Sequence, residues 1–161
     1  FNFKNIMKKS YIRLSLVQTG ESVIAEMLDK EAPQTCKLVW DMLPLEHSLI
    51  HGRFSGMEVF VLLDECIIIQ DEMRTNMPLP GEICYWTDSG SSVTSSGKPD
   101  AEILMAYGRG VTLRGAEGIP SFGNLFARIP GDWKYDWVDF ANVCNRIPTD
   151  GTQLLRIERA D

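Results

Sequence analysis

Apolar residues that alternate with polar ones along most of the chain are the feature that most restricts how it can fold. In residues 11–17, the apolar Ile12, Leu14 and Leu16 occupy every second position, which is the period of a strand with one buried face. Residues 22–27 repeat the pattern after a glycine-containing turn. The chain is therefore predicted to begin with an antiparallel hairpin.

Seven further segments are predicted to be strands because they are rich in apolar, β-branched or aromatic residues. They are residues 47–54, 57–63, 66–70, 83–86, 101–107, 124–129 and 154–158. Long loops are expected between them, and the serine- and glycine-rich residues 87–100 are expected to be the most mobile internal segment.

Two amphipathic helices interrupt the strands. Pro33 suits the first turn of a helix, and apolar residues follow it at helical spacing as far as Leu43, before Pro44 ends the helix. A second helix is expected to begin with Asp132 as its N-cap and to cover one end of a barrel. Its apolar stripe is Trp133, Trp137, Phe140, Ala141 and Cys144. Because closure removes exposed sheet edges, we predict a mainly β protein with a closed eight-stranded barrel and two α-helices.

Composition narrows the class of protein. The 161 residues, of which 44% are apolar, predict a single domain at 11–161 after an N-terminal extension at 1–10, although a chain that begins at Phe1 leaves its true N-terminus open. The net charge of -6 argues against nucleic acid as a partner. The apolar runs are too short to span a membrane, so a cytoplasmic location is expected. Four widely spaced cysteines predict buried free thiols.

The order of elements, together with several motifs, resembles the cyclophilin superfamily. ESVIAEMLDKEAPQTCKLVW is similar to the cyclophilin hairpin and its Pro-x-Thr helix, with Pro33 and Thr35 at the matching positions. HGRF resembles the strand that bears the cyclophilin arginine, here Arg53, while GEICYW and GNLFARI resemble two later strands. The combination with EILMAYGRG looks most like a group of uncharacterised, mainly prokaryotic cyclophilin-like proteins. The resemblance implies a closed cyclophilin-like barrel.

The resemblance does not extend to the rest of the isomerase site. After the turn glycine, where the isomerases have Phe, Met and then Gln, this chain has Met57, Glu58 and Phe60. Their Gln-Phe-Phe strand is matched by Glu102-Ile103-Leu104, and the Trp and His of their next loop have no counterpart. Isomerase activity is therefore not expected. Whether the chain catalyses any reaction stays open, with Arg53 as the best candidate for a catalytic residue.

We predict instead a groove on the outside of the barrel that binds a small anionic organic molecule or a peptide. Arginine forks beside aromatic walls suit such ligands. The predicted ligand-binding residues are His51, Arg53, Glu58, Phe60, Tyr85, Trp86, Glu102, Tyr107 and Arg109. A solvated rim of Arg–Glu pairs is the alternative interpretation of the same residues.

No metal and no cofactor are predicted. His47 and His51, the two histidines, would stand about 13 Å apart along a strand, too far to share a metal ion. Two alternative functions remain: a weak peptidyl-prolyl isomerase or peptide binder, because Arg53 is retained, and a structural homo-oligomerising module, because residues 66–70 form an apolar predicted strand.

Overall fold

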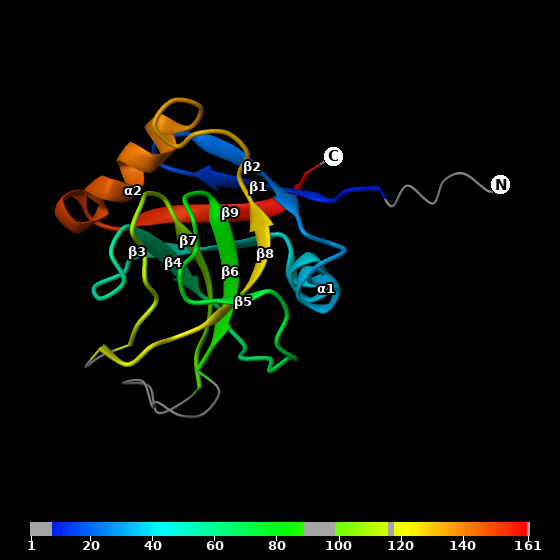
Figure 1. Ribbon diagram of the computed structural model, residues 1–161. Helices are drawn as coiled ribbons and strands as arrows, with labels where there is room; N and C mark the ends of the chain where they lie inside the picture. The colour runs from blue at the N-terminus through cyan, green and yellow to red at the C-terminus, as the bar shows by residue number, and fades with distance from the viewer. Residues whose placement is uncertain (1–7, 89–98, 116–117, 161) are drawn as a thin grey trace.

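Eight antiparallel strands close into a barrel in the computed structural model, which describes residues 8–88, 99–115 and 118–160 (Figure 1). The strands are β1 (Tyr11–Leu16), β2 (Ser22–Met27), β3 (Leu45–His51), β4 (Glu58–Leu62), β6 (Glu82–Thr87), β7 (Ala101–Ala106), β8 (Gly123–Arg128) and β9 (Gln153–Ala160). They neighbour each other in the order β2-β1-β9-β3-β4-β7-β6-β8, and β8 pairs with β2 to complete the ring. A two-residue strand, β5 (Arg74–Thr75), also pairs with β8. The predicted fold class is confirmed.

The apolar residues of the alternating segments face the inside of the barrel and form its core. Ile12, Leu14 and Leu16 are each at most 2% exposed, and they share one apolar cluster with the inward-facing residues of the other strands. The helices α1 (Pro33–Met42) and α2 (Val138–Asp150) add Cys36 and Phe140 to this cluster from different sides of the barrel (Figure 1). Both helices therefore cover the core with one apolar face, as amphipathic helices do.

Strand pairing divides the ring into two four-stranded halves. In the half β2-β1-β9-β3 the successive pairs share five, six and five residue registers, and in the half β4-β7-β6-β8 they share five, five and four. Only two registers join β3 to β4, and only two join β2 to β8. We call these two junctions the seams. The candidate site described below lies beside the β3–β4 seam.

The apolar segment at residues 66–70 is not a strand, so that prediction was wrong. Its backbone is bonded to side chains instead: the hydroxyl of Tyr85 donates to the carbonyl of Ile67 at 2.6 Å, and Nδ2 of Asn124 donates to the carbonyl of Gln70 at 2.9 Å. In a closed ring every barrel strand already has two neighbours. β2 leaves the first residues of β8 unpaired, and β5 rather than this segment pairs with them.

Two predicted boundaries also need correction. The strand predicted at 47–54 ends at His51, so Arg53 lies in the turn that follows β3. The second helix begins at Val138 rather than after Asp132, whose carbonyl accepts the N–H groups of Tyr135 and Asp136 in a separate turn. It then continues through Pro148 to Asp150. An aspartate that is typical of a helix N-cap can also stabilise an isolated turn, so the prediction that Asp132 caps the second helix was wrong.

Some expectations fall partly outside the described residues: the loop predicted at 87–100, for its residues 89–98, and the N-terminal extension, for its residues 1–7. All four cysteines are free, and Cys36, Cys84 and Cys144 are buried. Burial raises the pKa of the Cys36 thiol to about 12. Within the described ranges, no helix combines the length and the apolar character that a membrane crossing needs.

Candidate functional site

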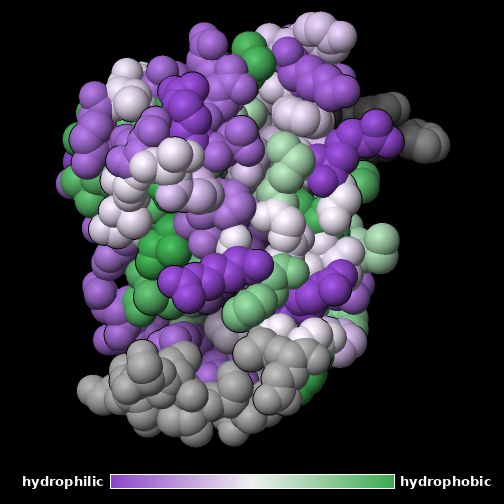
Figure 2. Space-filling model, turned by 90° about the vertical axis from the view of Figure 1, so that its left-hand side faces the viewer, coloured by the Kyte–Doolittle hydropathy of each residue, from purple (hydrophilic) through white to green (hydrophobic). Residues whose placement is uncertain are grey.

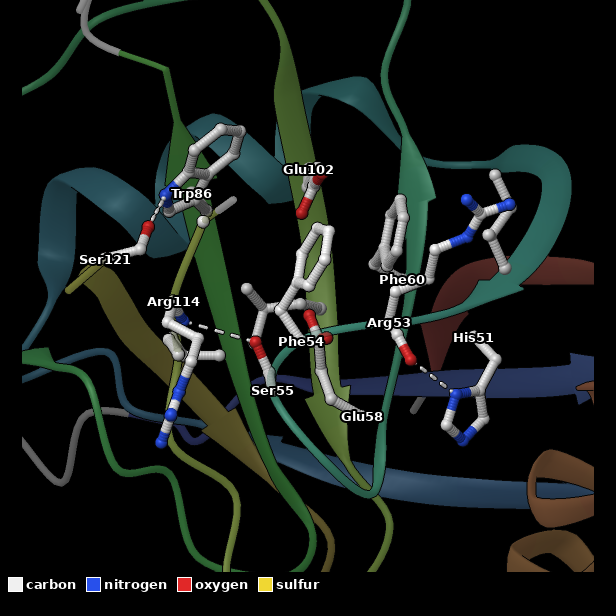
Figure 3. Close-up of a pocket in the computed structure, with 15 residues that line it drawn as sticks. His51, Arg53, Phe54, Ser55, Glu58, Phe60, Trp86, Glu102, Arg114 and Ser121 are labelled. Carbon is white, nitrogen blue, oxygen red and sulfur yellow. Dashed lines mark hydrogen bonds between the residues drawn. The ribbon is translucent and has the colours of Figure 1, made fainter. Parts of the chain in front are cut away.

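A cavity of about 280 Å³ opens on the outer wall of the barrel, beside the β3–β4 seam (Figure 3). Its lining comes from the end of β3 and the turn after it, from β4, β6 and β7, and from residues 113–115 and 121. The lining residues are Ile50, His51, Gly52, Arg53, Phe54, Ser55, Glu58, Phe60, Trp86, Glu102, Leu104, Leu113, Arg114, Gly115 and Ser121.

The strand period decides which residues face this cavity. On β4, Glu58 and Phe60 point outward, because the residues that alternate with them, Val59 and Val61, belong to the barrel core. On β7 the same alternation turns Glu102 outward, and the register places it directly opposite Trp86 of β6. The floor of the cavity is thus the outer face of three neighbouring strands.

Residues 111–115 and Ser121 lie over this face and form a wall of the cavity. Val111 and Leu113 are buried in a second apolar cluster, which lies outside the barrel against Leu104 and Cys84. The backbone N–H of Arg114 donates to Oγ of Ser55 at 3.3 Å, and the indole Nε1 of Trp86 donates to Oγ of Ser121. The wall is therefore bonded both to the turn after β3 and to β6.

Glu58, which is buried, and Glu102, which is half-buried, bring two carboxyl groups to this largely apolar cavity. Glu58 is 5% exposed, and burial raises its pKa to about 7. Burial also raises the pKa of Glu102 to about 8, with smaller contributions from the charges of Glu58 and Asp100. Neither carboxyl group has a hydrogen bond or an ion pair with the part of the chain that the structure describes. Both are disposed to hold a proton, or to accept a positive charge from outside.

Gly52 makes room for the Glu58 carboxyl group. A Cβ atom at position 52 would lie 2.0 Å from Oε2 of Glu58, closer than any real contact. The backbone N–H of Gly52 also donates to the carbonyl of Glu58 at 2.8 Å, which fixes the turn against β4. The absence of a side chain at residue 52 thus sets where the carboxyl group lies.

His51 is held by two hydrogen bonds at the edge of the cavity. Its Nδ1 lies 2.7 Å from the carbonyl oxygen of Gly52, and its Nε2 lies 2.6 Å from the hydroxyl of Tyr107. A carbonyl oxygen only accepts, so Nδ1 carries a proton. In the neutral ring Nε2 then accepts from the hydroxyl of Tyr107, which has one hydrogen to share between Nε2 and Oδ1 of Asn145, 3.3 Å away. Because both nitrogens are engaged, His51 positions the turn.

Two arginines stand at the rim. Figure 2 shows that hydrophilic residues cover much of the molecule in the view turned by 90°, with hydrophobic residues exposed between them. Arg53 and Arg114 are exposed, and neither forms an ion pair with a described residue. Figure 3 shows the guanidinium of Arg53 beside the ring of Phe60, away from Glu102, and the guanidinium of Arg114 directed away from the carboxyl groups. The ring of Phe54 stands between Phe60 and Trp86 in the same view. The Arg–Glu pairs of the alternative interpretation are not seen at these two arginines.

The cavity brings together six of the nine predicted ligand-binding residues: His51, Arg53, Glu58, Phe60, Trp86 and Glu102. The other three do not line it. Tyr85 and Tyr107 are buried in the barrel core, and Arg109 is exposed elsewhere on the loop after β7.

Sequence reasoning missed the lining residues Phe54, Ser55, Arg114 and Ser121. The alternation of Val111 and Leu113 with Thr112 and Arg114 was a usable signal, because it predicts a segment that packs one face on the sheet. The described residues contain no group of three or more His, Cys, Asp or Glu side chains placed to hold a metal ion. His47 lies apart from this cavity, with Nε2 3.8 Å from Asp64.

Comparison with known proteins finds a family model and two solved structures of interest. Residues 14–158 match the model of DUF3830, described as a protein of unknown function. The structure of McbB in complex with tryptophan is 16% identical, with a TM-score of 0.64, and the match covers 91% of this chain and 44% of McbB. The solution structure of the hypothetical protein AF2241 from Archaeoglobus fulgidus is also 16% identical, with a TM-score of 0.55 and coverage of 94% and 95%.

At this identity the likeness extends to the fold alone. The chain spans less than half the length of McbB. No curated protein matches the sequence significantly.

Proposed function

The chain belongs to the DUF3830 family of proteins of unknown function, and we propose that it binds a small organic molecule with an anionic group in the cavity beside the β3–β4 seam. The observation that carries the proposal is a cavity of about 280 Å³ with aromatic walls and two arginines without ion-pair partners among the described residues. Concave, mostly apolar sites with a few polar groups are typical of small-molecule binding.

The aromatic walls and the arginines would recognise different parts of the ligand. Phe54, Phe60 and Trp86 offer flat apolar surfaces for a ring or a chain. Arg53 is long and exposed, so it can turn toward an anionic group at the cavity mouth and bind it through a forked pair of hydrogen bonds. Arg114 stands on the other wall and can add a second positive charge.

We also propose that the barrel is of the cyclophilin type, which makes a weak prolyl isomerase or a peptide binder the second candidate. The support is the resemblance of HGRF to the arginine-bearing cyclophilin strand and the presence of Arg53 at the cavity. Glu58 argues against catalysis. It places a buried carboxyl group after Met57, in the segment where the isomerases have Phe, Met and then Gln. An exchange assay on a prolyl peptide that depends on Arg53 would favour this candidate.

Phenylpropionate, a carboxylate attached to a phenyl ring, is a suitable first probe. McbB forms a complex with tryptophan, which makes an aromatic probe a reasonable starting point. We expect 3-phenylpropionate to bind, and Arg53→Gln to weaken its binding by about tenfold, the effect of losing one charge-assisted hydrogen-bonded pair. Isothermal titration calorimetry measures both affinities.

The matched control is Arg109→Gln, because Arg109 is an exposed arginine on a neighbouring loop that does not line the cavity. We expect its affinity to stay within about twofold of the wild-type value. Equal losses in the two variants would mean that general charge, not the cavity, attracts the probe. Absence of binding to the wild-type protein would contradict the proposal.

A further inference from the structure

The floor of the cavity carries a chemical preference that the arginines do not explain. Glu58 is 5% exposed and has no hydrogen-bond partner among the described residues, and its side chain lines the cavity. A buried carboxyl group without a partner is costly to a fold, so its retention at a cavity wall points to a group that arrives from outside.

Glu102 is a second carboxyl group that lines the same cavity. It comes from β7, next to β4, but the register pairs Glu58 with Ala106 and Glu102 with Leu62, so the two residues lie four positions apart, about 13 Å along the strands. The sheet therefore offers two separate acidic positions. Glu58 is the more buried of the two, so it has more to gain from a group with a positive charge.

The aromatic walls favour an organic ammonium group over a metal ion. Structural zinc and calcium sites usually take three or more protein ligands, and the described residues place no such group of His, Cys, Asp and Glu side chains together. An ammonium group can be held by one carboxylate and by the faces of aromatic rings, here Phe54, Phe60 and Trp86. The cavity therefore combines an acidic floor, aromatic walls and a basic rim.

We infer that the ligand class of this site is a small aromatic zwitterion, an α-amino acid or a close analogue, with its ammonium group against Glu58 and its anionic group toward Arg53. This inference rests on the proposed function and deepens it. The protein as a whole is acidic, with a net charge of -6, which also favours the approach of cations.

Three probes with the same phenyl ring test the inference: phenylalanine, a zwitterion; phenethylamine, which lacks the carboxylate; and 3-phenylpropionate, which lacks the amine. Titrations followed by NMR would use the indole N–H signal of Trp86, because that group lies at the cavity wall. We expect phenylalanine to bind on the order of tenfold more tightly than 3-phenylpropionate.

Glu58→Gln gives opposite changes for the two charged probes, which a general loss of folding would not produce. We expect it to weaken phenethylamine on the order of tenfold and to strengthen 3-phenylpropionate, because the variant removes attraction for one and repulsion for the other. Glu102→Gln should act in the same direction with a smaller effect, because Glu102 lies four positions along the ladder from Glu58. The control is Glu65→Gln, because Glu65 is exposed and lies outside this cavity.

The outcomes separate this inference from the proposed function. Binding of 3-phenylpropionate that depends on Arg53, together with no preference for either amine, would overturn the inference and leave the proposed function standing. Binding of phenethylamine that depends on Glu58, without any binding of 3-phenylpropionate, would support the ammonium site and overturn the anionic one. If none of the probes binds, both are wrong.

Discussion

Gly52 and Glu58 show at the scale of single residues how a missing side chain shapes a site. Any Cβ at position 52 would collide with Oε2 of Glu58, so the carboxyl group keeps its buried place only beside glycine. In the sequence Gly52 is simply the second letter of HGRF, and nothing local says what it accommodates. The contact joins the turn after β3 to β4, which are neighbours through the fold.

The raised pKa of Glu58 predicts how the stability of the protein depends on pH. The carboxyl group of the unfolded chain loses its proton near its ordinary pKa of 4.5, whereas the folded chain keeps it up to about 7. The free energy of unfolding therefore falls as pH rises across this window, by about 3 kcal/mol from this one group. Glu58→Gln should remove this dependence, so the variant gains stability relative to wild type as the pH rises from 4.5 to above 7.

Urea unfolding at pH 4.5, 6, 7 and 8 measures this difference. Glu102, Arg53 and Arg114 also line the cavity, and their charges affect the pH range over which stability changes. They are present in both wild type and Glu58→Gln, so the comparison of the two proteins isolates Glu58. Glu65→Gln, at an exposed carboxylate, should show the wild-type pH profile. A constant difference between Glu58→Gln and wild type at all four pH values would contradict the prediction.

Single residues also show where the sequence was sufficient and where it was not. The period of two that places Glu102 outward turns Tyr107, five positions later, inward, and it likewise separates Trp86 from Tyr85. Strict use of that period would have excluded both tyrosines from the predicted site. Arg114 and Phe54 lie outside strands, where no period applies, so their positions depend on the path of the backbone.

At the scale of elements, α1 is held at both ends by residues from distant parts of the chain. Its N-cap residue, Ala32, has no side chain that can accept a hydrogen bond. Glu72 takes that role: its carboxylate accepts the backbone N–H groups of Gln34 at 3.0 Å and Thr35 at 2.8 Å, together with the hydroxyl of Thr35. An acceptor with a negative charge at a helix N-terminus also interacts favourably with the helix dipole.

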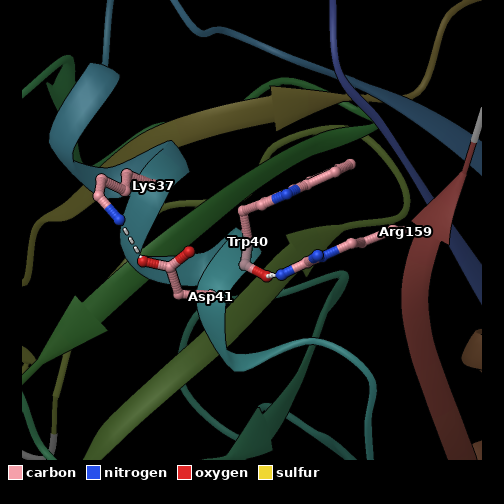
Figure 4. A network of polar contacts seen from close by, with 4 residues as sticks. All are labelled: Lys37, Trp40, Asp41 and Arg159. Carbon is pink, nitrogen blue, oxygen red and sulfur yellow. Dashed lines mark hydrogen bonds and ion pairs between the residues drawn. The ribbon is translucent and has the colours of Figure 1, made fainter.

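The other end of α1 is bonded to β9 (Figure 4). The guanidinium of Arg159 donates to the carbonyl of Trp40 from Nη2 at 2.8 Å and lies 4.8 Å from the centre of its ring. The exposed pair Lys37–Asp41 on the same helix is a local contact one turn apart. A local sequence pattern predicted this helix, but neither of its two distant partners.

Glu72→Ala should destabilise the protein by about 1 to 2 kcal/mol, because it leaves the first turn of α1 without its acceptor. Although burial acts to raise the pKa of Glu72, the hydrogen bonds from Thr35 and Gln34 lower it overall. Its stabilising effect is therefore present above pH 4.5 and is lost as the pH falls through its lowered pKa. The two proteins should converge in stability at low pH.

Thermal or urea unfolding measures this loss. Glu31→Ala is the matched control, because Glu31 is an exposed carboxylate just before the same helix. We expect the control to change the free energy of unfolding by less than about 0.5 kcal/mol. Equal effects of the two substitutions would show that the helix is not capped by Glu72.

At the scale of the whole molecule, the two seams should be the least stable parts of the ring. Each seam has two paired registers, whereas β1 and β9 share six. Fewer paired residues make local opening easier. We expect the amide hydrogens of Gly52 and Leu28, which bond across the two seams, to exchange about tenfold or more faster than those between β1 and β9.

Native-state hydrogen exchange followed by NMR measures these rates. A ligand bound beside the β3–β4 seam should slow exchange at Gly52 more than at Leu28, which provides an internal control. Uniform protection around the ring would contradict the prediction. The sequence predicted a closed barrel of eight strands, although it also assigned a strand to residues 66–70. It did not predict the division into halves, because register depends on contacts between distant segments.

The position of β9 between β1 and β3 has a consequence for folding during synthesis on the ribosome. The half formed by β4, β6, β7 and β8 uses a continuous stretch, residues 58–128, so its ladders can form while synthesis continues. The first hairpin differs, because β1 can pair with β9 only after residues 153–160 have been synthesised. The outer edge of β1 therefore stays without its partner strand until the last residues of the ring are made, which exposes an apolar hairpin during synthesis.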